Sequence, residues 1–143
     1  MGKILAFTNQ KGGTGKTTLS ANLAVLWSNS QYKVAVIDGD NQKSLSNWIE
    51  ARKKYYGEKD IGFDVHPYNS HSFGEDIKNI KRKYNFIIVD SPPSITYDTI
   101  QIIKNANRVF VPVQPSPIDL MATIPFLNLT KQERKKSTVV LNR

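Results

Sequence analysis

Two stretches of this 143-residue chain are apolar at every position until they end at an aspartate. They read Val-Ala-Val-Ile-Asp at residues 34–38 and Phe-Ile-Ile-Val-Asp at residues 86–90. A strand without polar alternation is covered by protein on both faces, which is typical of the parallel sheets of α/β proteins. We therefore predict an α/β fold with a doubly wound, mostly parallel sheet, whose ligand site lies beyond the carboxyl ends of the strands.

The remaining sequence alternates between strand and helix patterns. Strands are predicted at residues 3–8, 33–38, 63–66, 86–90, 108–114 and 137–141. Helices are predicted at residues 17–28, 44–54, 73–83, 97–105 and 119–130, and Pro125 should kink or break the last of them. The strand ends to be examined for function are then Thr8, Asp38, Asp90 and Gln114.

Composition narrows the classes of protein that the chain can belong to. Its 143 residues, 39% of them apolar, suffice for one domain with its own core. The absence of cysteine excludes disulfides, thiolate metal sites and cysteine nucleophiles. No stretch reaches the ~18 apolar residues that span a bilayer, and no signal-peptide core is present, so we expect a cytoplasmic protein with no membrane partner. The net charge of +8 favours polyanionic partners such as nucleic acid, nucleotides or acidic lipid.

A glycine-rich run follows the first predicted strand. Residues 9–18 read Asn-Gln-Lys-Gly-Gly-Thr-Gly-Lys-Thr-Thr. Glycines let consecutive N–H groups point at a phosphate chain, a lysine at position 16 can reach the outer phosphates, and the Thr17 hydroxyl can ligate Mg²⁺. The standard pattern G-x-x-x-x-G-K-[ST] would require glycine at position 10, where this chain has Gln10, and a second lysine, Lys11, precedes the glycine pair.

With Lys11 included, the run resembles the deviant Walker A loop, K-G-G-x-G-K-[ST]-T, of the ParA, MinD and nitrogenase-iron-protein ATPases. Residues 38–48 are similar to the family's D-x-D-P-Q segment and the helix start after it, although Asn41 replaces the usual proline. Residues 86–93 resemble its Walker B strand followed by D-x-P-P. The likeness runs from residue 3 to the last residue, and is close to small plasmid-partition ParA proteins.

The resemblance assigns roles to residues of this chain. It implies ATP or ADP with Mg²⁺ as ligands and a nucleotide site formed by these residues: Lys11, Gly12, Gly13, Thr14, Gly15, Lys16, Thr17, Thr18 and Asn142. Metal ligation falls to Thr17 directly and to Asp38 and Asp90 through water. The catalytic residues are Lys16, Asp40 as the group that orients the attacking water, and Lys11. Because Lys11 precedes the glycines, we expect it to meet nucleotide bound by a facing subunit.

Several residues allow two interpretations. Strand-end aspartates often cap the next helix, so Asp38, Asp40 and Asp90 could serve that purpose. Asn142 and Arg143 lie where the family contacts adenine, or are simply solvated. The basic runs at residues 78–83 and 131–136 could touch phosphates, or be solvated helix ends.

One group of aromatic residues and one pair of histidines also allow a functional interpretation. Trp48, Tyr55 and Tyr56 could offer a stacking surface for bases, but core packing with a solvated face is the favoured interpretation. His66 and His71 are five residues apart, which does not suit a metal pair on one helix face, and we expect surface residues.

The resemblance implies a ParA-like ATPase for plasmid or chromosome partition. Such a protein dimerises on ATP, binds DNA non-specifically, works with a ParB-like partner and is nucleoid-associated when ATP-bound. We expect residues 1–143 to form a single ATPase domain that lacks C-terminal helices, with weak basal turnover. The alternatives are a MinD-like positioning ATPase and a truncated, non-catalytic nucleotide-binding protein.

Overall fold

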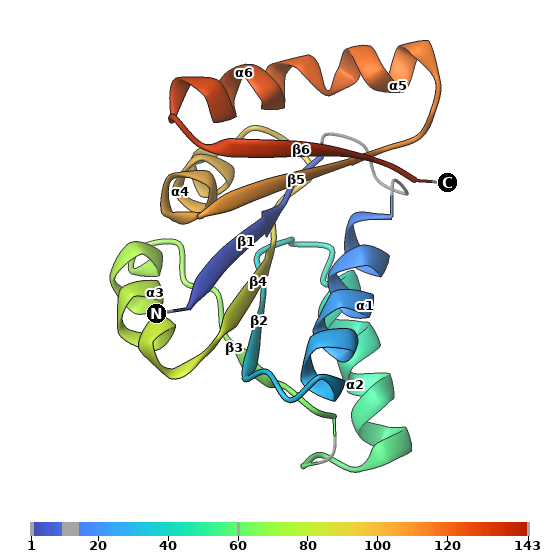
Figure 1. Ribbon diagram of the computed structural model, residues 1–143, viewed down its shortest axis with the longest axis vertical. Coiled ribbons are helices and arrows are strands. Elements are labelled where there is room, and N and C mark those ends of the chain that lie inside the picture. Colours follow the sequence, from blue (N-terminus) through green and yellow to red (C-terminus); the bar gives the residue numbers. More distant parts are fainter. Residues whose placement is uncertain (1, 10–14, 60, 143) are drawn as a thin grey trace.

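The structure, a computed structural model, describes residues 2–9, 15–59 and 61–142. Its six described strands form one parallel sheet in the order β3-β2-β4-β1-β5-β6 (Figure 1). The strands are β1 (Lys3–Phe7), β2 (Val34–Asp38), β3 (Asp64–His66), β4 (Phe86–Asp90), β5 (Arg108–Val113) and β6 (Lys136–Leu141). The predicted parallel sheet is confirmed.

Helices cover both faces of this sheet, as the doubly wound prediction requires. One face carries α1 (Lys16–Asn29) and α2 (Ser44–Tyr56), while α3 (Phe73–Ile80), α4 (Tyr97–Asn105) and α6 (Ile124–Gln132) lie on the other (Figure 1). The short helix α5 (Pro117–Ala122) precedes α6. Side chains alternate along each strand, so in β1 Leu5 and Phe7 pack towards α1, whereas Ile4 and Ala6 pack towards α4.

Two predicted helices differ in the structure. The helix predicted at residues 73–83 ends at Ile80, and Lys81–Lys83 form a 3₁₀ turn. The Lys81 carbonyl there accepts a hydrogen bond from the N–H of Gly2 (2.9 Å), which ties this turn to the start of β1. The helix predicted at residues 119–130 is two helices, α5 and α6, that meet at Thr123. Pro125 lies in the first turn of α6, where its missing N–H costs no helical hydrogen bond, so the predicted break is confirmed.

The strand register brings the carboxyl ends of the central strands together. Asp38 of β2 is the direct partner of Asp90 of β4, and Asp90 is also the partner of Phe7 in β1. Because the strands are parallel, the residues that follow them lie along the same edge of the sheet. This edge also holds the start of α1, since only residues 8–15 separate β1 from that helix.

Candidate functional site

Lys16 is the first residue of α1, and its side chain points into a cluster of oxygen atoms. The ammonium Nζ lies 3.1 Å from Asp40 Oδ2 and 3.1 Å from Asp90 Oδ1. It also donates to the main-chain carbonyl of Ser91. Lys16 is 7% exposed and Asp90 is fully buried, so these charges depend on one another for stabilisation.

Asp90 combines a buried carboxylate with a neighbouring hydroxyl. Thr17 Oγ1 donates to Asp90 Oδ2 at 3.0 Å, while Asp90 Oδ1 has its ion pair with Lys16 but no aligned hydrogen bond. Burial raises the pKa of Asp90 to about 6, and Lys16 and Thr17 act in the opposite direction. A hydroxyl beside a carboxylate is the hard-oxygen donor set that Mg²⁺ prefers, so Thr17 and Asp90 fit that ion.

The Asp38 carboxylate accepts hydrogen bonds from two other residues, Asp40 and Ser46. Its Oδ1 accepts the N–H of Asp40 (3.1 Å), and its Oδ2 accepts both the N–H (2.8 Å) and the hydroxyl (2.6 Å) of Ser46. Ser46 lies in the first turn of α2, where N–H groups lack helical partners. Asp38 therefore does bind a helix start, and a role in holding a metal-bound water would come in addition to that capping contact.

Asp40 lies between the start of α2 and Lys16. Its Oδ1 accepts the N–H of Gln42 (2.9 Å), and its Oδ2 forms the ion pair with Lys16. The side chain is buried, although the residue lies in a loop rather than a strand. The structure thus brings Lys16, Asp40 and Asp90 into direct contact, as the sequence motifs imply.

Asn142 follows β6 and lies against the start of α1. Its N–H donates to the Val113 carbonyl (2.8 Å). A Cβ built on Gly15 would collide with Asn142 Nδ2, and Gly15 has φ +89°, a conformation that favours glycine. Asn142 is therefore at the base of the glycine-rich loop. Thr18, by contrast, is exposed.

Part of the predicted nucleotide site belongs to segments that the structure does not describe. Lys11, Gly12, Gly13 and Thr14 lie outside the described residues, and so does Arg143. The roles assigned to them stay predictions.

Sequence reasoning missed two residues of this site. The Ser46 hydroxyl donates a hydrogen bond to the Asp38 carboxylate. The Ser91 carbonyl accepts a hydrogen bond from Lys16, and the Ser91 hydroxyl donates to the Phe7 carbonyl (2.7 Å). A signal existed for Ser91, because it directly follows the aspartate that ends β4. For Ser46 the signal was weaker: the helix predicted at residues 44–54 has Ser46 in its first turn, but only the fold shows that this turn lies beside Asp38.

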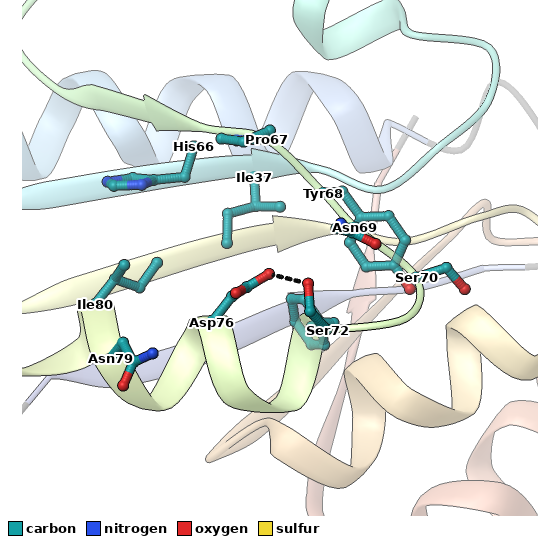
Figure 2. A pocket seen from close by; sticks show the side chains of 11 residues that line it. Ile37, His66, Pro67, Tyr68, Asn69, Ser70, Ser72, Asp76, Asn79 and Ile80 are labelled. Atoms are coloured by element: carbon teal, nitrogen blue, oxygen red, sulfur yellow. Dashed lines mark hydrogen bonds between the residues drawn. The ribbon is translucent and has the colours of Figure 1, made fainter.

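A hollow of about 580 Å³ lies away from this site, between α3 and the segment after β3 (Figure 2). Its wall includes Ile37, Tyr68 and Asp76, and Ser72 donates to Asp76 at 2.6 Å. None of the predicted site residues lines it. His66, also in its wall, has its Nε2 2.7 Å from the Tyr84 hydroxyl. The described residues contain no group of three or more His, Asp or Glu side chains that could hold a metal ion.

The sheet is parallel and doubly wound, and a lysine and a threonine at the start of the first helix face the aspartate of a neighbouring strand. This combination defines a P-loop nucleotide-binding protein. The sequence matches the CobQ/CobB/MinD/ParA nucleotide binding domain over residues 5–142. The chain therefore belongs to this family of ParA- and MinD-type P-loop ATPases.

Individual proteins of this family are similar to the chain in sequence and in structure. The chain is 32% identical to maintenance of carboxysome distribution protein A of Halothiobacillus neapolitanus, over 97% of this chain and 65% of that protein. It is 28% identical to the sporulation initiation inhibitor protein Soj of Bacillus subtilis, over 94% of this chain and 67% of Soj. The crystal structure of the Pyrococcus furiosus cell division ATPase MinD superposes with a TM-score of 0.81 at 25% identity, covering 100% of this chain and 73% of that one. The chain spans less than two thirds of the length of the first of these relatives.

No helix within residues 2–9, 15–59 and 61–142 is both long and apolar enough to cross a membrane.

Proposed function

We propose that this chain binds Mg-ATP at residues 11–18 and hydrolyses it to ADP and phosphate, as one ATPase domain. The observation that carries the proposal is the convergence of Lys16, Thr17 and Asp90, with an ion pair of 3.1 Å and a hydrogen bond of 3.0 Å joining them. Buried charges in this arrangement are typical of a site that positions and neutralises phosphates.

Each of the site residues has its own part in the proposed reaction. Lys16 holds β- and γ-phosphate oxygens, and Thr17 and Asp90 hold Mg²⁺, Asp90 through water. Mg²⁺, when bound, neutralises charge on the phosphates. Asp40 orients the attacking water, because it is the carboxylate nearest to Lys16 that lies on a loop rather than in the sheet. Gly15 and Asn142 support the base of the loop.

For the cellular role we propose ParA-like partition of plasmid or chromosomal DNA. In this scheme ATP joins two copies of the chain, Lys11 of each copy acts on the other's nucleotide, and the dimer binds DNA non-specifically on the nucleoid. A ParB-like partner stimulates hydrolysis and releases it. Family membership and the net charge of +8 support this proposal.

A second candidate is a positioning ATPase for a protein assembly. It is favoured by the 32% identity to a carboxysome distribution protein. The two candidates share the nucleotide site and differ in cargo. ATP-dependent retention on DNA that a DNA-bound partner ends by stimulating hydrolysis supports the first, and ATP-dependent retention of a protein assembly supports the second.

The direct test is calorimetric titration of Mg-ATP into the Lys16→Ala variant, with phosphate release measured on the same protein. We expect both binding and turnover to be lost, because Lys16 is the only cation within the described residues that forms ion pairs with Asp40 and Asp90. The control is Lys53→Ala, since Lys53 pairs with Glu50 on the surface of α2. Unchanged ATP affinity in Lys16→Ala would refute the site.

A further inference from the structure

A second hollow, of about 710 Å³, lies at the opposite edge of the sheet from Lys16. It is lined by the first residues of four strands and by the end of α1, and we call it the basic hollow. The strand residues are Lys3, Phe86, Arg108 and Lys136. These residues lie at the amino-terminal ends of the strands, whereas Lys16 lies at the carboxyl-terminal ends. A ligand in the basic hollow would therefore leave the nucleotide site accessible.

The rim of the basic hollow carries five cations from three separate segments of the chain. They are Lys3, Arg108, Arg134, Lys135 and Lys136. No acidic residue is among those that line it. Within the described parts of the chain, none of the five forms an ion pair, and the guanidinium of Arg108 donates only to the Thr138 hydroxyl, at 3.4 Å. Like charges gathered without counter-charges favour an anionic ligand.

The floor of the basic hollow is apolar and largely aromatic. Trp27 of α1 stacks on Phe86 with ring centroids 4.1 Å apart, and Phe110 stacks on Phe7 at 5.2 Å. Trp27, Phe86 and Phe110 are all only partly buried. Cations around partly accessible aromatic rings are what proteins use to bind phosphates and stack bases of unpaired strands.

The other basic run offers no such combination. Lys83 lines a different hollow, whose wall also contains Glu58 and Asp64. Phosphates near that surface would meet carboxylates as well as lysines. Of the two basic runs in the sequence, the geometry therefore selects residues 131–136.

We propose that the basic hollow binds single-stranded nucleic acid, with phosphates on the cationic rim and a base against the aromatic floor. A duplex presents phosphates but no free base faces, so it cannot use the floor. The inference rests on the proposed function only for the class of partner, and it adds the surface and the strandedness.

The test is fluorescence anisotropy of a labelled 20-nucleotide oligothymidine with the full chain, in saturating Mg-ADP so that the phosphate loop is not the binding site. The triple variant Arg108→Ala/Lys135→Ala/Lys136→Ala is compared with Lys81→Ala/Arg82→Ala/Lys83→Ala, which removes the same charge. We expect the dissociation constant to rise at least about tenfold in the first and less than about twofold in the second. The log–log salt slope should flatten by about 2 in the first, at about 0.7 for each lost contact.

A second readout does not depend on charge variants. In a Trp48→Phe chain Trp27 is the remaining tryptophan, and the oligonucleotide should quench its fluorescence. Calorimetry of Mg-ADP on the same sample reports the nucleotide site separately, so failure of the proposed function is distinguishable from failure of this inference.

Four outcomes would overturn the assignment. Equal weakening in both triple variants would show only a net-charge effect. Tighter binding of a duplex of the same length would remove the role of the floor. Thymidine monophosphate binding as tightly as the 20-mer would indicate a free-nucleotide site. A polyglutamate peptide that binds more tightly than the oligonucleotide would indicate an acidic protein segment instead.

Discussion

Lys16 forms ion pairs with two buried carboxylates, Asp40 and Asp90. Motif spacing placed all three residues in one site, and the structure brings them into contact. Spacing could not show that Lys16 also reaches the Ser91 carbonyl, because a main-chain acceptor leaves no mark in residue type.

Asp40→Asn tests the role proposed for Asp40. The amide keeps an acceptor for the Gln42 N–H but loses the charge that faces Lys16. We expect ATP binding to persist and hydrolysis to slow by ~10²- to 10³-fold, the usual cost of one preorganised catalytic group. Phosphate release and calorimetry measure the two effects. Asp76→Asn, at the hollow in Figure 2, is the control. Full turnover in Asp40→Asn would move the water-orienting role to Asp38.

The ionisation of Tyr84 should make the free energy of unfolding depend on pH in the alkaline range. Its hydroxyl donates to Asp64 at 2.7 Å, and burial together with this carboxylate raises its pKa to about 12. An unfolded tyrosine titrates near about 10, so its contribution is complete below about pH 10 and is lost as the pH rises towards 12. In Tyr84→Phe, the free energy of unfolding should fall less over this range, as measured by urea unfolding.

The control for that measurement is Tyr55→Phe, because Tyr55 is 82% exposed. Burial and Asp98 also raise the pKa of Tyr68, so part of the alkaline slope should persist in Tyr84→Phe. Identical slopes in the wild type and Tyr84→Phe would contradict the assignment.

At the scale of elements, the start of α2 links secondary structure to the site. Asp38 ends β2 and accepts two hydrogen bonds from Ser46 in the first turn of that helix. The two interpretations of this aspartate, cap and site residue, are therefore compatible. Helix and strand types could be predicted from periodicity, but the end of α3 at Ile80 could not, because Gly2 lies far from it in the sequence and contacts the turn that follows.

Ser46→Ala should lower the free energy of unfolding by about 1 kcal/mol, since the Asp38 carboxylate loses one donor but keeps the two main-chain N–H groups. Urea unfolding measures the change. Ser44→Ala, at the exposed first residue of the same helix, should have less effect. Equal stability of the two variants would mean that the main-chain donors alone hold Asp38.

At the scale of the whole molecule, the parallel register decides which residues can act together. Asp38 and Asp90 are 52 residues apart in the numbering, yet they are direct partners in β2 and β4. The same register gathers the cations of the basic hollow at the opposite edge. Long-range pairing of this kind follows from strand order, which no local pattern encodes.

Lys11→Ala tests the proposed dimer. Lys11 lies outside the described residues, and the prediction rests on its place before the glycines. We expect ADP affinity to stay unchanged while ATP-dependent dimers and turnover are lost, because Lys11 acts only on the partner's nucleotide. Sedimentation velocity with ATP measures the dimer, and Lys16→Ala, which should lose ADP binding as well, is the contrast. Normal dimers in Lys11→Ala would exclude the role across the interface.

The sequence by itself determined the fold class, the position of the glycine-rich run after the first strand and the aspartates that end the central strands. These depend on local patterns, namely apolar runs, glycine spacing and the residue that follows each strand. The tertiary structure alone decided that Ser46 holds Asp38, that Asn142 lies against Gly15, and that residues 134–136 share a hollow with Lys3. Each of these contacts joins segments whose proximity is set by strand order and by the packing of helices on the sheet, so the physical reason for them exists only in the folded chain.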